Sequence, residues 1–156
     1  MTDFAPVLLA EDDENDLILI RRAFRTVGLP NPLLVVRDGQ EAIWYLNGEG
    51  IYADRRKYPW PCLVLLDLKM PLADGFDVLA WLQKRRRHKD LRVVIFTSSN
   101  QDADQLRAFG LGADGYWVKP PYFDELLAIA RHVQQQIQQI PTLPAWLAPR
   151  TGEARL

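Results

Sequence analysis

The chain alternates short apolar runs with segments in which apolar residues recur three or four positions apart. The apolar runs are Val7–Ala10, Leu33–Val36, Cys62–Leu66, Val93–Phe96 and Tyr116–Val118. Runs this short, with little polar alternation, are typical of strands buried on both faces of a parallel sheet. The pattern therefore predicts five strands.

The segments between and after these runs predict five helices. Apolar residues have helical spacing in 17–27, 42–46, 76–82 and 103–109, and again from Phe123 to Ile140, where Pro141 ends the last helix. Strict alternation of strands and helices predicts an α/β fold, a doubly wound five-stranded parallel sheet with helices on both faces.

Two segments lie outside this alternation. Residues 49–61 are long for a connection between a helix and a strand. They hold three aromatic residues, Tyr52, Tyr58 and Trp60, and a basic run at 55–57. We favour a surface excursion anchored by its aromatic rings over a loop that binds a partner. For the tail, 141–156, we expect packing near Trp146 and disorder toward its end.

Composition limits the function classes. The 156 residues are 48% hydrophobic and 25% charged, which suits one soluble domain. The 19 basic and 20 acidic residues give a net charge of −1, so we expect neither nucleic acid nor membrane as a partner. The basic run 84–89 is interpreted as a solvated helix end in preference to a nucleic-acid patch. A single cysteine and no targeting or spanning segment indicate a cytoplasmic protein.

Chemistry-bearing residues follow four of the predicted strands. Glu11, Asp12 and Asp13 come after the first strand, Asp67 after the third, Thr97 to Ser99 after the fourth, and Lys119 after the fifth. The carboxyl ends of parallel strands share one edge of a sheet, where ligands of open α/β folds bind. Packed carboxylates need a compensating cation, and Mg²⁺ prefers oxygen ligands. An Asp beside such a cation is a competent nucleophile toward a phosphoryl group.

Each of these residues has a simpler interpretation when taken alone. Asp13 and Thr97 are plausible helix caps, and Lys119 is plausible as a surface charge. Their joint occurrence at four strand ends makes the simpler interpretations improbable.

These motifs identify a family resemblance. The matching stretches are 7–13 (VLLAEDD), 65–71 (LLDLKMP), 74–75 (DG), 96–99 (FTSS) and 112–120 (GADGYWVKP). The sequence resembles the receiver domain of two-component response regulators, the CheY-like fold, over residues 5–140. The resemblance implies a flavodoxin-like strand order of 2-1-3-4-5. It also implies that 141–156 is a proline-containing, partly disordered tail, with no output domain. Within the family, the sequence is similar to single-domain regulators that partner phytochrome-type sensor kinases.

The resemblance assigns a role to each matching residue. Asp67 is the expected phosphoacceptor, and Mg²⁺ is expected on Glu11, Asp12, Asp67 and the backbone carbonyl of Lys69. Thr97 and Lys119 would bind phosphoryl oxygens, and Tyr116 would be the aromatic switch residue. The Lys119–Pro120 peptide is expected to be cis, as is usual in the family. Two residues keep open interpretations: the Lys69 side chain as a neighbour of the site or a solvent-facing charge, and Ser99 as a space for water or a bystander.

The resemblance also implies partners. The expected phosphoryl donor is a sensor histidine kinase or a phosphotransfer protein, and the output is a contact with a downstream protein. A homodimer through the fourth helix, fifth strand and fifth helix is a further expectation. The end of the last helix, 133–140, either packs on the core or pairs with a partner.

Three other functions fit these residues less well than a phosphoacceptor does. A phosphorylation-independent interaction scaffold is disfavoured by the intact set of site residues. A metal-dependent phosphohydrolase would need an acid-base residue where Lys69 stands, and a flavodoxin-like redox protein would need a phosphate loop after the first strand. We therefore expect a phosphoacceptor that is no enzyme beyond its own phosphorylation and autodephosphorylation.

Overall fold

A computed structural model describes residues 4–85 and 91–138. The elements are, in order, β1 (Val7–Ala10), α1 (Glu14–Val27), β2 (Leu33–Val36), α2 (Gly39–Asn47), the 3₁₀ turn η1 (Gly50–Ala53), β3 (Leu63–Leu66), α3 (Gly75–Lys84), β4 (Arg92–Thr97), α4 (Asp102–Gly110), β5 (Gly115–Val118) and α5 (Phe123–Gln138). The predictions for the tail and for 86–90 fall outside the described residues.

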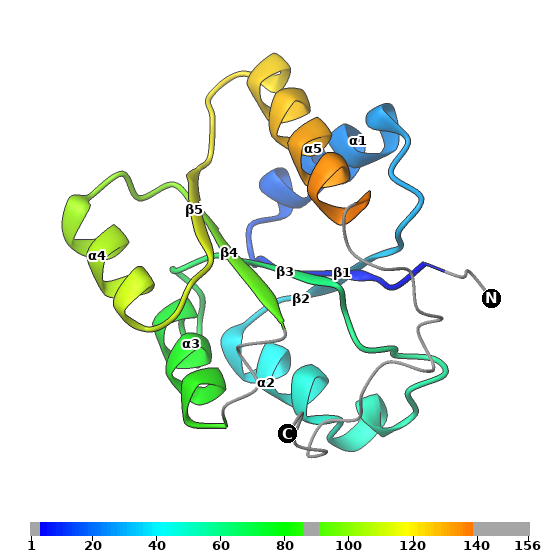
Figure 1. Ribbon diagram of the computed structural model, residues 1–156, viewed down its shortest axis with the longest axis vertical. Coiled ribbons are helices and arrows are strands. Elements are labelled where there is room, and N and C mark those ends of the chain that lie inside the picture. The colour runs from blue at the N-terminus through cyan, green and yellow to red at the C-terminus, as the bar shows by residue number, and fades with distance from the viewer. Residues whose placement is uncertain (1–3, 86–90, 139–156) are drawn as a thin grey trace.

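The five strands form one parallel sheet in the order β2-β1-β3-β4-β5. In Figure 1, α1 and α5 lie together on one face of the sheet, while α2 and α3 lie on the opposite face. The doubly wound fold and its strand order are confirmed. Over the described residues, no helix is long and apolar enough to cross a membrane.

Alternate residues of the central strands supply two separate cores. Val7 and Leu9 of β1 pack with α1 and α5, whereas Leu8 and Ala10 pack with α2 and α3. All four are buried, as the unbroken apolar run predicts. The edge strands differ, because β5 is at most half-buried along its length.

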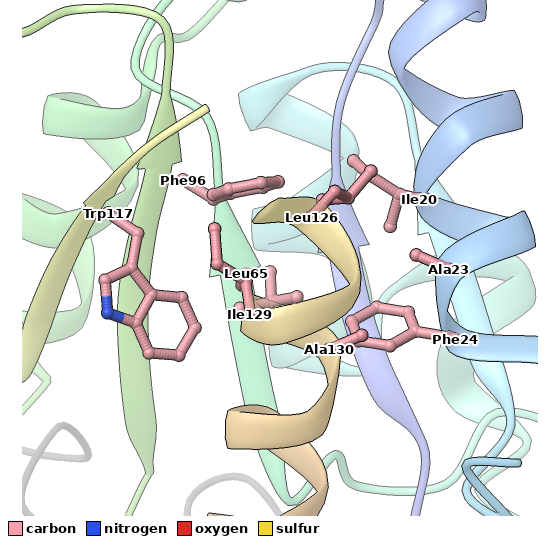
Figure 2. A pocket seen from close by; sticks show the side chains of 9 residues that line it. All are labelled: Ile20, Ala23, Phe24, Leu65, Phe96, Trp117, Leu126, Ile129 and Ala130. Atoms are coloured by element: carbon pink, nitrogen blue, oxygen red, sulfur yellow. The ribbon is translucent and has the colours of Figure 1, made fainter. Parts of the chain in front are cut away.

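The core beneath α5 is closely packed. Figure 2 shows Phe24 of α1, Leu126 of α5 and Trp117 of β5 around a void between these helices and the sheet. The void measures about 10 Å³ and its lining is almost wholly apolar, so it lacks the polar partners that an ordered water requires. Val133 and Ile137 are buried in this same core, so the end of α5 packs on the domain as far as it is described.

The excursion at 49–61 is anchored by an arginine as well as by aromatic rings. The Arg55 guanidinium donates to the carbonyl oxygens of Tyr45 at 2.7 Å, Leu46 at 2.9 Å and Tyr58 at 3.3 Å. The first two are carbonyls of the last turn of α2, where carbonyl groups lack the usual partners four residues on; the Tyr45 carbonyl also accepts from the Gly48 N–H at 3.2 Å. Tyr52 is buried in the same cluster, its ring 5.1 Å from that of Tyr45. The segment is therefore a packed surface excursion.

Candidate functional site

The register of β1 and β3 brings two carboxylates together at the carboxyl edge of the sheet. Ala10 pairs with Leu66, and the Asp67 backbone N–H donates to the Ala10 carbonyl at 3.1 Å. The next residue along each strand is therefore an acid, Glu11 on one side and Asp67 on the other. Both side chains are buried, with 1% of Glu11 and 6% of Asp67 exposed.

Glu11, Asp12 and Asp67 form a set of oxygen donors. One carboxylate oxygen from each lies within 4.8 Å of the others, and Asp12 is the exposed member. Glu11 Oε2 accepts from the Asp13 backbone N–H at 3.2 Å, while the buried Glu11 Oε1 faces the Lys119 ammonium. Three converging carboxylates offer the hard oxygen ligands that a divalent cation such as Mg²⁺ prefers. The residues present therefore fit the expected metal.

Lys119 reaches this cluster from the end of β5. Its Nζ donates to Asp67 Oδ2 and to Asp16 Oδ2, both at 2.8 Å, and it is ion-paired with Glu11 Oε1. Burial alone would lower the pKa of Lys119, but its contacts with Asp16, Asp67 and Glu11 together raise that pKa above its ordinary value. Burial raises the pKa of Glu11 to about 7, although contact with Lys119 opposes the rise.

Asp16 is a site residue that the sequence analysis missed. It occupies the third position of α1, and its carboxylate faces the Lys119 ammonium across 103 positions of sequence. A side chain in the first turn of a helix leans toward the helix N-terminus, which here lies above the end of β1. The place of Asp16 three residues after the predicted cap Asp13 was the signal that could have found it.

Thr97 and Tyr116 are linked through the chain that follows β4. Thr97 is fully buried, and its Oγ1 accepts from the Ser99 backbone N–H at 3.4 Å. The Tyr116 hydroxyl donates to the Ser99 carbonyl at 2.9 Å, and the Ser99 hydroxyl donates to Asp104 Oδ2 at 2.5 Å. Ser99 is therefore bonded to both α4 and β5, and neither earlier interpretation of it foresaw this.

The predicted caps divide into one that forms and one that does not. Asp13 caps α1 by accepting from the Asp16 backbone N–H at 3.0 Å. Thr97 is the last residue of β4, and Gln101 precedes α4 in the capping position.

Lys69 contributes its backbone to the acceptor. Its N–H donates to Asp67 Oδ1 at 3.3 Å, while its side chain is exposed. That side chain lines an open groove of about 540 Å³ beside the site, which Asp12, Asp74 and Asp104 also line. Its exposure beside the site is compatible with both interpretations of Lys69, as a neighbour of the site and as a solvent-facing charge.

Gly75 permits the close approach of α3 to the acceptor. A Cβ at this position would lie 2.4 Å from the Asp67 carbonyl oxygen, a distance that real side chains do not adopt. The Gly75 N–H donates to the Leu68 carbonyl at 3.0 Å. Asp74 and Asp77 complete a capping box on the same turn. The Asp74-Gly75 motif thus holds the chain after Asp67 in place.

The prediction of a cis Lys119–Pro120 peptide is wrong. The described residues contain no cis peptide bond. The Lys119 N–H donates to the Thr97 carbonyl at 2.7 Å, and this bond directs the end of β5 toward the site. The trans form, which X–Pro bonds favour by about 0.5–1 kcal/mol, is compatible with the ion pairs of Lys119.

Comparison with known proteins agrees with this geometry. The family model described as the response regulator receiver domain matches residues 7–131. The chain belongs to the response regulator receiver family.

The relatives include regulators of light signalling. Response regulator Rcp1 of Synechocystis sp. is 30% identical over 139 residues, which cover 89% of this chain and 92% of Rcp1. The phosphorylated cyanobacterial phytochrome response regulator RcpA has a crystal structure that matches with a TM-score of 0.79 and 32% identity, covering 90% of this chain and 99% of RcpA. RPA3017, a response regulator in red light signalling of R. palustris, matches with a TM-score of 0.82 and 29% identity, again covering 90% of this chain and 99% of that one.

Proposed function

We propose that this chain is a phosphoacceptor of a two-component phosphorelay, with Asp67 as the acceptor. The observation that carries the proposal is the position of the Asp67 carboxylate. The residue is 6% exposed at the sheet edge, and its carboxylate lies 2.8 Å from the Lys119 ammonium and within 4.8 Å of oxygens from Glu11 and Asp12. Membership of the receiver family supports the same assignment.

In the proposed reaction, Asp67 attacks the phosphorus of a phosphohistidine on a kinase or phosphotransfer protein. The new bond joins phosphorus to an Asp67 carboxylate oxygen, and the phosphorus–nitrogen bond breaks with its electron pair left on the histidine. Lys119 would donate to one phosphoryl oxygen and Thr97 to another. Such fixed donors stabilise the charge spread over a transferring phosphoryl group.

Glu11, Asp12 and Asp67 would hold Mg²⁺, together with the backbone carbonyl of Lys69. When bound, the ion would neutralise the phosphoryl oxygens and the carboxylates around them. The convergence of three carboxylate oxygens within 4.8 Å of one another supports a cation here. A crystal structure of Rcp1 in its Mn²⁺-bound form, 30% identical with a TM-score of 0.76, supports it further.

Phosphorylation would act as a switch through Thr97 and Tyr116. Thr97 Oγ1 accepts a hydrogen bond from the Ser99 N–H, and the Ser99 carbonyl accepts one from the Tyr116 hydroxyl. Movement of Thr97 toward a phosphoryl oxygen would therefore displace Ser99. Release of that hydroxyl would let the Tyr116 ring turn inward. The change is a shift between two populations of the same fold.

The proposed role as a phosphoacceptor also suggests partners. We propose that residues 5–140 act as the receiver, in the cytoplasm. A phytochrome-type sensor kinase is the proposed donor, on the strength of the similarity to RcpA and RPA3017. Exposed Leu106 and Phe109 of α4 and Val118 of β5 support contact with a downstream protein or a second copy on that side. Nucleic acid is not a proposed partner.

The test is phosphorylation by acetyl phosphate with Mg²⁺, followed by intact-protein mass spectrometry. The expected result is one added phosphoryl group in the wild type and none in Asp67→Asn. Asp124→Asn, which changes an exposed acid in the first turn of α5 outside the donor set, is the matched control and should still be labelled. An unlabelled wild type would overturn the proposal in favour of a receiver-fold scaffold, and many turnovers on phosphate esters would indicate a phosphohydrolase.

A further inference from the structure

Three helices of this domain begin with the same pattern, an Asp cap followed three positions later by a second acid. The pairs are Asp13 and Asp16 on α1, Asp38 and Glu41 on α2, and Asp74 and Asp77 on α3. In each pair the cap accepts from the backbone N–H of the second acid. The carboxylate of the second acid is then available for another bond.

On α3, the second acid completes the cap. Asp77 Oδ2 accepts from the Asp74 backbone N–H at 2.9 Å, which is the reciprocal bond of a capping box. The Asp77 carboxylate therefore serves its own helix.

On α1, the cap's backbone N–H is bonded to another carboxylate and not to the second acid of the pair. The Asp13 N–H donates to Glu11 Oε2, so Asp16 is not needed for the cap. Its Oδ2 instead accepts from Lys119 Nζ at 2.8 Å. The local helix does not require this carboxylate, and its partner is the lysine of the site.

Asp16 also differs from the other two carboxylates that contact Lys119. Glu11 and Asp67 belong to the set whose oxygens meet within 4.8 Å, and Asp16 does not. Its side chain is 35% exposed, against 1% for Glu11 and 8% for Asp67. It lies at the mouth of the site, where it can keep its contact with Lys119 when the other two are otherwise engaged.

We propose that Asp16 is a positioning residue, which holds the Lys119 ammonium at the mouth of the site while Asp67 is phosphorylated. This inference rests on the proposed function, in which Lys119 comes to bind a phosphoryl oxygen on Asp67. Lys119 then passes from the Asp67 carboxylate to the phosphoryl oxygen without losing its bond to Asp16. The ammonium is thereby kept oriented during the transfer, which reduces the cost of reaching the transition state.

The kinetic test measures the rate of a single phosphorylation by acetyl phosphate at saturating Mg²⁺ and compares variants of Asp16 with the wild type. Asp16→Asn should slow the rate about three- to tenfold, because the amide keeps an oxygen acceptor but loses the charge, a loss comparable to one ordinary hydrogen bond. Asp16→Glu should recover part of the loss. Glu14→Gln is the matched control, because it removes the same charge from the same helix turn but from a side chain paired with Arg37.

A mutant cycle separates positioning from a general loss of negative charge. In a Lys119→Met background, Asp16→Asn should have less than about a twofold effect if Asp16 acts through the lysine. An equal loss in both backgrounds would overturn the inference, as would a wild-type rate in Asp16→Asn.

A second measurement does not depend on phosphorylation. The ¹⁵Nζ resonance of Lys119 should shift in Asp16→Asn and stay in place in Glu14→Gln. If the wild type is never labelled, the proposed function fails, and an unshifted resonance would also refute the contact. If the wild type is labelled but the resonance and rate are unchanged, only the role of Asp16 fails.

Discussion

Burial of Glu11 should make the metal-free protein less stable as the pH rises. The Glu11 side chain is 1% exposed, and burial raises its pKa from 4.5 to about 7 despite contact with Lys119. Below pH 4.5 the carboxyl group is protonated in the folded and in the unfolded chain. Between about pH 4.5 and 7 the unfolded chain releases this proton more readily, so the free energy of unfolding falls.

The size of the effect follows from the two pKa values. Each tenfold change in acid strength is worth about 1.4 kcal/mol, so a pKa raised from 4.5 to about 7 corresponds to about 3 kcal/mol. Glu11→Gln removes the ionisable group and with it this penalty. Relative to the wild type, the variant should therefore gain about 3 kcal/mol between pH 4.5 and 8.

Urea unfolding with a chelator present, at several pH values between 4.5 and 8, measures this difference. Any constant effect of the amide cancels, because only the change with pH is used. Glu14→Gln is the control, because it removes one carboxylate from a side chain that is 60% exposed and so measures the effect of losing a surface charge. A stability difference between Glu11→Gln and wild type that stays flat over this range would refute the reasoning.

Three further predictions use other contacts of the site and fold. The apparent affinity for Mn²⁺ should rise about tenfold from pH 6 to pH 8, because Glu11 must lose its proton to bind a cation; calorimetry that finds no pH dependence would contradict this. Gly75→Ala should lower the free energy of unfolding by about 2 kcal/mol and slow phosphorylation, because the new Cβ displaces the Asp67 carbonyl. Gly110→Ala, which adds a Cβ in open space, should do neither, and equal losses in urea melts would rule out the clash. Arg55→Lys should cost about 1–3 kcal/mol, since an ammonium cannot reach the same carbonyl oxygens; unchanged stability would mean that the aromatic rings alone anchor residues 49–61.

The sequence pattern predicted the parts of the fold that depend on burial. Val7–Ala10 was placed as a strand buried on both faces, and its residues do alternate between two cores. Strand ends then indicated that Glu11, Asp67 and Lys119 would meet, because the order of strands in a parallel sheet determines which ends share an edge. These inferences need only periodicity and topology.

Contacts that depend on a choice between hydrogen-bond partners were not predicted. Asp16 bonds Lys119 because Glu11, and not Asp16, accepts from the Asp13 N–H. Arg55 has its role because the chain after α2 folds back on the end of that helix. The trans Lys119–Pro120 peptide likewise reflects local geometry, which a family pattern does not determine.

Burial differs across the sheet, and this difference has a mechanical consequence. The central strands β1 and β3, which carry Glu11 and Asp67 at their ends, are buried along their whole length, whereas β5 is half-buried or exposed. Deformation of the central pair would disturb two cores at once, while rotation of the half-buried Tyr116 on β5 disturbs less packed surface. The domain is thus stiff at the strand ends where a phosphoryl group would bind and more easily deformed at β5. A structural change that starts at Asp67 would therefore be taken up at the β5 edge of the sheet.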